Sequence, residues 1–190
     1  MLITDIRPIA LTAPYGMPGA QTRRRSAVFV EVETADGVVG VGETYLGVYM
    51  PEVAIEAVRF FAPHLIGRDS SNIARLWRDA MWISSYVGRT GPTVMVLGAI
   101  EGARWDLAGK RAGRPVHALL GGAVHDRLPV YASGGVPTFS REQLVDNARL
   151  AAAAGYRGFK MRANPVAYQP GLEAERALAA RPALRRAPLP

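Results

Sequence analysis

Two basic residues, Lys160 and Arg162, alternate with apolar residues in a short β-forming segment at positions 158–162 (GFKMR). Successive side chains of a strand point to opposite faces, so the two cations would share one face and Phe159 and Met161 the other. If the apolar pair packs on covering helices, the cations lie at the carboxyl end of a sheet, where parallel α/β folds place their active sites. A lysine held beside a second cation is a candidate general base. The same pattern also fits a solvated edge strand with ordinary surface cations.

A strand–helix–strand unit is predicted to carry these cations. Residues 128–136 (LPVYASGGV) are typical of a strand that ends in glycines, and residues 156–162 of a second strand. Between them, Ser140 and Gln143 form a capping box that starts a helix over residues 141–154. Short connections of this kind imply parallel strands. Two parallel strands cannot bury their own faces, so this unit is expected to begin a larger sheet.

The first 45 residues predict a small antiparallel sheet. Residues 2–11 and 26–34 are rich in β-branched residues, and an Asp-Gly turn at positions 36–37 leads into a third strand at 38–42. Residues 15–25, rich in Gly, Pro and Arg, are expected to form a long loop between the first two strands.

Three helices are predicted after this sheet. The first begins at Pro51, the second follows the Ser-Ser-Asn sequence at 70–72, and the third spans about 93–111. The third is apolar all round in its first half, which indicates burial. Gly98 and Gly102, four residues apart, would let another element approach its backbone closely.

Composition and charge exclude several classes of protein. The 190-residue chain is 49% apolar, has no cysteine and carries a net charge of +7. A disulfide scaffold and a thiolate metal site are therefore excluded, and the N-terminus lacks the pattern of a signal peptide. The expected protein is globular and cytoplasmic, with no membrane partner. No nucleic-acid partner is expected either, because no basic helix or aromatic platform accompanies the run Arg23-Arg24-Arg25.

Most of the positive charge lies in the last fifteen residues. Residues 176–190 contain four arginines and no acidic residue, and without them the net charge is +3. This stretch is built from Arg, Ala, Leu and Pro alone, and Pro182, Pro188 and Pro190 are expected to interrupt any helix. We therefore expect a disordered or out-of-frame tail, and with it a truncated or frame-shifted chain.

A set of short motifs resembles a known family. Residues 99–103 (AIEGA), 105–110 (WDLAGK), 113–116 (GRPV) and 119–122 (LLGG) are similar to the mandelate racemase/muconate lactonizing group of the enolase superfamily. Arg104 departs from the pattern, since the family usually carries a small or apolar residue there.

The resemblance implies an α+β capping domain, an antiparallel sheet with a helical bundle, over residues 1–127. The first βαβ unit of an incomplete TIM-type (β/α) barrel would follow at 128–175, before the tail at 176–190. A complete barrel takes about 250 residues, far more than the chain offers after Leu128.

The resemblance also implies chemistry. Family members are Mg²⁺-dependent enzymes that remove a proton alpha to a carboxylate of a small acid-sugar or hydroxy-acid substrate. Lys160 would be a partner of the substrate carboxylate. Arg162 takes the place of the acid/base lysine, and since arginine is a poor base we expect it to position or polarise substrate. This pattern favours a sugar-acid dehydratase, with a racemase or cycloisomerase as the alternative.

Two segments are similar to the loops that close over the barrel mouth in this family. Their candidate substrate-specificity residues are Arg23, Arg24, Arg25, Tyr45 and Tyr49. For each of them a solvated loop residue is the alternative.

The resemblance places the metal carboxylates at the ends of the third to fifth barrel strands, which this chain does not reach. We therefore expect Mg²⁺ in a full-length relative, no metal ligand among these residues, and little activity of the chain alone. The alternative is a non-catalytic fragment that acts as an interaction or dimerisation module, with a homo-oligomer as the candidate assembly.

Overall fold

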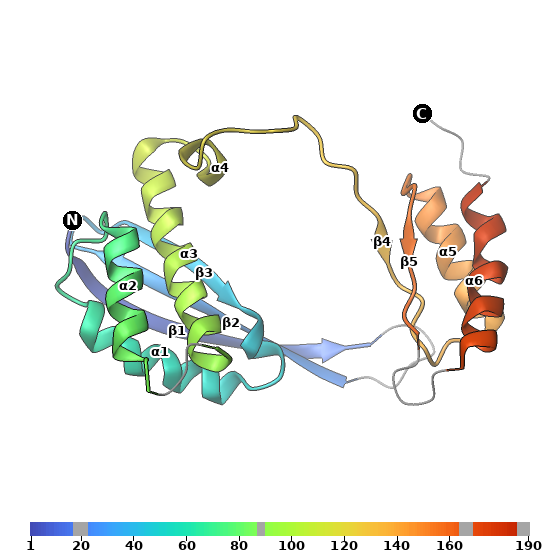
Figure 1. The fold of residues 1–190 in the computed structure, drawn as a ribbon, viewed down its shortest axis with the longest axis horizontal. Coiled ribbons are helices and arrows are strands. Elements are labelled where there is room, and N and C mark those ends of the chain that lie inside the picture. Colours follow the sequence, from blue (N-terminus) through green and yellow to red (C-terminus); the bar gives the residue numbers. More distant parts are fainter. Residues whose placement is uncertain (17–22, 87–89, 164–168, 186–190) are drawn as a thin grey trace. The chain divides into compact units, whose positions relative to one another are not determined.

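The computed structural model describes residues 1–16, 23–86, 90–163 and 169–185. The chain divides into two compact units, one ending at Val124 and the other beginning at His125, and Figure 1 shows the elements of each. Each unit has a hydrophobic cluster of its own. Among the described residues, none of the helices combines the length and apolar character needed to cross a bilayer.

The first unit is built on a three-stranded antiparallel sheet in the order β1-β2-β3. Its strands are β1 (Ile3–Tyr15), β2 (Arg23–Thr34) and β3 (Val39–Thr44). The predicted sheet is confirmed, but the predicted loop over 15–25 is wrong at both ends, because Tyr15 pairs with Arg23 in the β1–β2 ladder. Arg23, Arg24 and Arg25 therefore belong to strand β2 and not to a loop. Gly37 makes the β2–β3 turn at φ 76°, a left-handed conformation that suits glycine.

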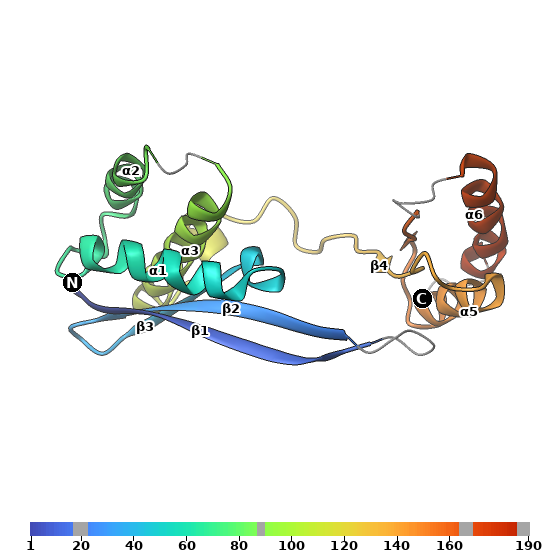
Figure 2. The ribbon, with the colours of Figure 1, turned by 90° about the horizontal axis from the view of Figure 1, so that it is seen from below.

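Helices cover one face of this sheet. Those that pack on the sheet are η1 (Tyr45–Val48), α1 (Pro51–Leu65) and α3 (Pro92–Ala112). Helix α2 (Ile73–Ile83) packs on α1 and α3, and the short α4 (Val116–Leu119) packs on α3. The predicted starts of α1 at Pro51 and of α2 after Asn72 are confirmed. In Figure 2, α1 and α3 lie along the sheet and α2 lies beyond them. Val28, Val30 and Val32 of β2 are fully buried beneath these helices.

Glycines of β3, rather than those of α3, allow the closest approach between sheet and helix. A Cβ atom on Gly42 would lie 2.0 Å from the Ala99 carbonyl oxygen, and one on Gly40 would lie 2.0 Å from that of Ala103. Gly98 has nothing within 4 Å of such an atom. The prediction that helix glycines provide this contact was therefore wrong for Gly98, because that position is on the exposed side of α3.

Side chains of α3 also bind the free edge of β3. Asp106 accepts a hydrogen bond from the Val41 backbone N–H at 2.9 Å, and the Lys110 ammonium donates to the Val39 carbonyl at 2.7 Å. The two side chains also form an ion pair with each other at 2.7 Å. Helix α3 is thus bound to β3 through its backbone and through its side chains.

Arg104 of α3 is the buried charge in this core. Only 2% of its surface is exposed, and one guanidinium nitrogen donates to the Ile73 carbonyl at 3.1 Å. Among the described residues, its Nε and Nη1 atoms have no hydrogen-bond partner. Burial lowers the pKa of Arg104 to about 10. The folded state therefore carries the cost of a poorly compensated buried cation at neutral pH.

Replacing Arg104 with methionine is expected to raise the free energy of unfolding by about 1–3 kcal/mol, since an apolar side chain of similar length removes that cost. Because folding lowers the pKa, the unfolded state binds more protons than the folded state between about pH 10 and pH 12.5, so the difference in stability between the two proteins should narrow as pH rises above about 10. Urea titrations at pH 7 and at about pH 10.5 measure both effects. The matched control, Arg75→Met on the exposed surface of α2, should change stability by less than about 0.5 kcal/mol. A less stable Arg104→Met protein would contradict this account.

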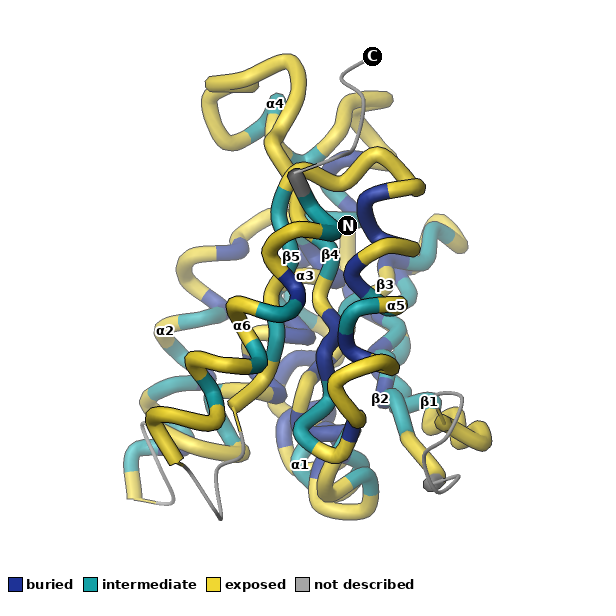
Figure 3. Tube along the Cα trace, turned by 90° about the vertical axis from the view of Figure 1, so that its right-hand side faces the viewer, coloured by how far each residue is buried: buried dark blue, intermediate teal, exposed yellow. Residues whose placement is uncertain are grey.

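The second unit contains two short parallel strands and two helices. The elements are β4 (Ala132–Ser133), α5 (Arg141–Ala153), β5 (Phe159–Lys160) and α6 (Pro170–Arg185). The predicted capping box at Ser140 and the parallel pairing of the strands are both confirmed. The strands are much shorter than predicted. Buried positions recur along one side of α5, as its alternating colours in Figure 3 show.

Helix α6 corrects the prediction for the start of the tail. The prolines were expected to prevent a helix, yet α6 includes Pro182 and ends at Arg185. Pro182 lies in the last turn, with only three residues of α6 after it, and Ala180, Ala183 and Leu184 pack with the unit's apolar cluster. Residues 186–190, with Pro188 and Pro190, lie outside the described residues.

Candidate functional site

The two faces of β5 differ as the sequence predicts. Phe159 and Met161 pack against the cluster formed by Leu144 and its neighbours on α5 and α6. Lys160 and Arg162 are exposed on the other side of the alternation. The apolar pair therefore fixes the strand on the helices, and the two cations are left accessible to a ligand.

A glycine pair holds the backbone beside the cations. The Gly134 N–H donates to the Lys160 carbonyl at 2.9 Å, and the Arg162 N–H donates to the Gly135 carbonyl at 3.1 Å. The Asn147 side chain of α5 accepts from the Gly135 N–H at 3.0 Å. A Cβ atom on Gly134 would lie 2.2 Å from that Asn147 oxygen. The glycines predicted at the end of this strand thus let α5 and β5 approach it closely.

Arg176 is a positioning residue that sequence reasoning missed. Its guanidinium donates to the Phe139 carbonyl at 2.9 Å and to the Val136 carbonyl at 3.1 Å, and it lies 3.5 Å from Glu173. These contacts tie α6 to the segment that follows β4. Its placement in an arginine-rich, low-complexity stretch concealed this role, and the sequence carries no separate signal for it.

The candidate specificity residues of the first unit form two small groups. The Tyr45 and Tyr49 rings meet edge to face at 5.5 Å, with their hydroxyl oxygens 3.2 Å apart, at the start and the end of η1. On β2, the Arg25 guanidinium lies 4.3 Å from the centre of the Tyr15 ring. Arg24 is exposed beside it and pairs with Pro14 in the β1–β2 ladder.

The structure brings Tyr45 into contact with Tyr49, places Arg23, Arg24 and Arg25 one after another on β2, and leaves both Lys160 and Arg162 exposed. The first two groups belong to the first unit and the third to the second unit. The substrate-binding role of each residue stays a prediction.

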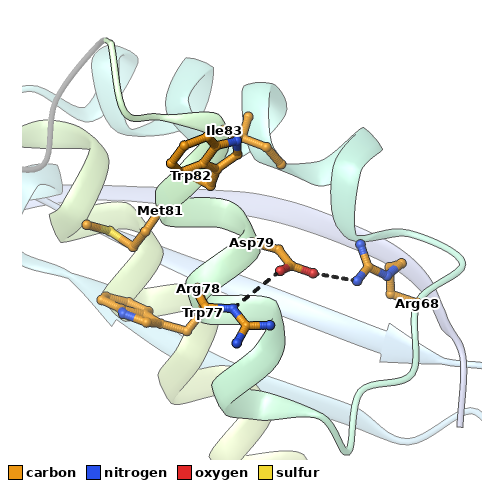
Figure 4. Close-up of a pocket in the computed structure, with 7 residues that line it drawn as sticks. All are labelled: Arg68, Trp77, Arg78, Asp79, Met81, Trp82 and Ile83. Carbon is orange, nitrogen blue, oxygen red and sulfur yellow. Dashed lines mark hydrogen bonds and ion pairs between the residues drawn. The ribbon is translucent and has the colours of Figure 1, made fainter.

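A hollow of about 730 Å³ lies on the surface of α2, and none of the predicted site residues lines it. Figure 4 shows Trp77, Met81 and Trp82 beside Asp79, which forms an ion pair with Arg68 at 2.7 Å. The hydrogen bond from Arg68 lowers the pKa of Asp79. The hollow combines aromatic surface with a charge pair that is already satisfied.

The carboxylates of the described residues do not fit a magnesium site. Mg²⁺ binds through oxygen ligands, with carboxylates gathered at one point, and among the described residues no three acidic or histidine side chains are grouped in this way. In the second unit, Asp146 is paired with Arg149 at 2.9 Å and Glu142 accepts from the Ser140 hydroxyl at 2.8 Å.

The first unit, an antiparallel three-stranded sheet under a helical layer, has the architecture of an enolase-type capping domain. Residues 3–121 match the model of the mandelate racemase/muconate lactonizing enzyme N-terminal domain. The chain belongs to this family of the enolase superfamily.

Relatives and solved structures agree with this assignment. The chain is 37% identical over 123 residues to a D-galactonate dehydratase family member of Paenibacillus, covering 63% of this chain and 30% of the relative. It is 32% identical over 149 residues to D-galactarolactone cycloisomerase of Agrobacterium fabrum, covering 78% of this chain and 39% of the relative.

Among solved structures, L-talarate/galactarate dehydratase of Salmonella typhimurium, liganded with Mg and L-lyxarohydroxamate, superposes with a TM-score of 0.84 at 26% identity. That match covers 99% of this chain and 50% of the solved one. The chain therefore spans about half the length of this structure, and less of the two relatives.

Proposed function

We propose that this chain supplies the capping domain and the first strands of the barrel of a Mg²⁺-dependent sugar-acid dehydratase. In this proposal residues 1–127 form the cap and residues 128–175 form the first βαβ unit of the barrel. The main support is the family match over residues 3–121, together with sugar-acid dehydratases among the relatives.

Lys160 and Arg162 bind the substrate carboxylate in this proposal. Both are exposed at one end of β5, and the backbone around them is fixed by Gly134, Gly135 and Asn147. An ammonium and a guanidinium together can donate several charge-assisted hydrogen bonds to one carboxylate. Arginine keeps its proton at any working pH, so Arg162 orients and polarises the acid, and another group removes the proton alpha to it.

In the first unit, the tyrosine pair and the β2 arginines are the proposed substrate-recognition residues. Tyr45 and Tyr49 present two hydroxyl groups together, which suits a hydroxylated carbon chain. Arg23, Arg24 and Arg25 supply positive charge suited to an acid. The cofactor of the whole enzyme is Mg²⁺, which would stabilise the negative charge formed on proton removal.

Carboxylate binding by the cation pair can be measured on the chain itself. Titration of ¹⁵N-labelled chain with D-galactonate is expected to shift the amide signals around Lys160 and Arg162, with a dissociation constant in the range of about 1 mM. Neutral D-galactose should leave those signals in place, because it lacks the carboxylate. Lys160→Met should weaken binding roughly tenfold, whereas the control Arg157→Met, also exposed and near β5, should bind as the parent does.

If D-galactonate and D-galactose shifted the amide signals around Lys160 and Arg162 equally, the proposal that these cations bind the substrate carboxylate would be wrong. Assays of the chain with Mg²⁺ and a panel of sugar acids are expected to show neither micromolar metal binding nor formation of a 2-keto-3-deoxy acid. Formation of that product would show that the metal ligands do lie within these residues.

A cycloisomerase is the second candidate, since the relative of that activity covers 78% of this chain. The two reactions differ in product. Dehydration removes one water, so its product is lighter than the substrate by the mass of one water molecule, whereas a cycloisomerisation opens or closes a ring and leaves the mass unchanged; mass spectrometry of the product distinguishes the two. A product assay on the whole enzyme therefore separates the candidates.

A further inference from the structure

The outer side of α2 carries an exposed stripe of arginine and tryptophan. Arg75, Arg78 and Trp82 are separated by three and four residues, a spacing that places them on one face of a helix. All three are exposed, and Trp82 keeps 75% of its surface accessible. Figure 2 shows α2 as the helix of the first unit that lies farthest from the sheet. We use the name α2 face for these three residues and the hollow beside them.

The hollow of about 730 Å³ on α2 adds apolar surface to this stripe. Trp77, Met81 and Ile83 line it together with Trp82, as Figure 4 shows. Trp77 and Met81 also pack against the hydrophobic core of the first unit, so they form a fixed wall. An indole ring that stays mostly in water beside such a wall is characteristic of a surface that is covered in a complex.

The arginines of the α2 face are not neutralised by their own surroundings. Asp79 accepts a hydrogen bond from Arg68 at 2.7 Å, while Arg75 and Arg78 lie 3.9 Å from the same carboxylate. Within the described parts of the chain, neither of these two arginines donates a hydrogen bond. The other acid of this segment, Asp69, pairs with the N-terminal ammonium at 2.7 Å. Three guanidinium groups around one carboxylate therefore leave a net charge of about +2 at neutral pH.

An occupant of the α2 face must therefore be both anionic and apolar. Guanidinium groups bind carboxylates through charge-assisted hydrogen bonds, and the tryptophans with Met81 favour an aromatic or branched apolar group. Among the described residues, α2 and Arg68 alone line the hollow, so a small molecule would keep much of its surface in water, unlike the ligand of an enclosed pocket. A peptide segment that lies along α2 reaches the arginines and Trp82 together, over about 10 Å of helix.

A nucleic acid fits these charges less well than an acidic peptide does. Its affinity comes from many phosphates that are each bound by lysine or arginine, whereas the α2 face offers two guanidinium groups without a hydrogen bond. An acidic peptide needs few charge contacts and supplies apolar side chains for the hollow. The charges and the apolar surface together therefore favour the peptide.

We propose that the α2 face binds an acidic peptide segment of a partner protein, with its carboxylates on Arg75 and Arg78 and an apolar side chain in the hollow against Trp82. This contact is small compared with a standard protein interface, so we expect a dissociation constant of about 10–100 µM. None of the residues proposed for substrate recognition belongs to the α2 face, so this inference does not rest on the proposed enzymatic function.

The test is fluorescence anisotropy of the full chain with a labelled acidic peptide of sequence DEDLFEEL. Two control peptides are matched to it: KKKLFKKL keeps the apolar residues and reverses the charges, and DEDSSEES keeps the charges and removes the apolar residues. Both should bind at least tenfold more weakly. Added salt should weaken binding of the acidic peptide, because screening reduces the attraction between exposed charges.

Variants of the chain show whether the peptide binds at the α2 face. Arg78→Glu should raise the dissociation constant at least tenfold, and the control Arg141→Glu, in the exposed first turn of α5, should bind as the parent does. Trp82→Ala should weaken binding to a similar extent, whereas Leu150→Ala, on the exposed surface of α5, should have no effect. The double variant Arg75→Glu/Arg78→Glu should reverse the preference and bind KKKLFKKL more tightly than DEDLFEEL. Circular dichroism of every variant shows whether the fold is retained.

Several outcomes would overturn the proposal. One is the absence of saturable binding of DEDLFEEL up to about 1 mM, and another is equal binding by the parent and Arg78→Glu. Two further probes represent other occupants: an oligothymidylate of about twelve nucleotides for a nucleic acid, and phenylacetate for a small aromatic acid. If either bound at least as tightly as DEDLFEEL, the α2 face would belong to that class of ligand and the peptide proposal would be wrong.

Discussion

Gly42→Val is expected to lower the free energy of unfolding of the first unit by at least about 3 kcal/mol. Even a single added carbon would lie 2.0 Å from the Ala99 carbonyl oxygen and 2.9 Å from the Ala103 nitrogen. Both are backbone atoms of α3, so no side-chain rotation relieves the clash, and the helix must move away from β3. Overpacking that forces backbone movement is among the most destabilising changes in a core. Urea denaturation followed by circular dichroism measures the loss.

Gly98→Ala provides the matched control in the same sheet–helix pair. Its new methyl group has open space around it, and alanine favours the interior of a helix over glycine by about 1 kcal/mol. This change should therefore leave the unit as stable as before or slightly more stable. If Gly42→Val were tolerated as well as Gly98→Ala, the close contact between β3 and α3 would be wrong.

Arg111→Met is expected to lower the free energy of unfolding by about 2–3 kcal/mol. At the end of α3, the guanidinium donates to Asp36 at 2.8 Å, to the Thr34 hydroxyl at 2.6 Å and to the Ser70 hydroxyl at 2.9 Å. It therefore joins the β2–β3 turn to the segment before α2. The variant leaves several part-buried polar groups without this donor.

The loss should depend on pH. The hydrogen bond from Arg111 holds the pKa of Asp36 well below its usual range. A carboxyl group with a lowered folded-state pKa adds stability above its ordinary pKa of about 4, and that stability is lost as pH falls. The difference between parent and Arg111→Met should therefore be larger at pH 7 than at pH 2.5.

Arg149→Met is the control for Arg111→Met. Arg149 forms a single exposed ion pair with Asp146 on α5, and such pairs contribute less than about 1 kcal/mol. If Arg149→Met lowered the free energy of unfolding as much as Arg111→Met does, the contacts of Arg111 would contribute no more to stability than a single exposed ion pair.

Much of the first unit could be predicted from local sequence patterns. Alternating apolar residues, the Asp-Gly turn and the proline at the start of α1 each act over a few residues, and the structure confirms the elements they indicate. The capping box of α5 is a local signal of the same kind. Contacts between distant segments were harder to predict, because nothing in the predicted strand around glycines 40 and 42 indicates that α3 lies against them.

The second unit shows where local reasoning fails. The prolines near the end of α6 suggested an interruption, but packing of Ala180 and Leu184 against α5 outweighs that preference. Arg176, which binds two carbonyl groups beyond β4, could not be found by composition. For the candidate site, the alternation of side chains along a strand correctly predicted that Phe159 and Met161 pack on the helices while Lys160 is exposed. The chemical role of the two cations depends on other parts of the whole enzyme, which this pattern does not describe.

By binding the edge of β3, Asp106 and Lys110 protect the protein from strand-to-strand aggregation at high concentration. A bare edge strand offers free N–H and C=O groups on which foreign strands can grow into amyloid-like fibrils. The Val41 N–H and the Val39 carbonyl are already bound by these two side chains, and Pro8 and Pro14 interrupt the donors along β1 at the opposite edge. The double variant Asp106→Ala/Lys110→Ala would leave these two backbone groups of β3 unpaired, so that strands of other molecules could add to this edge and form fibrils.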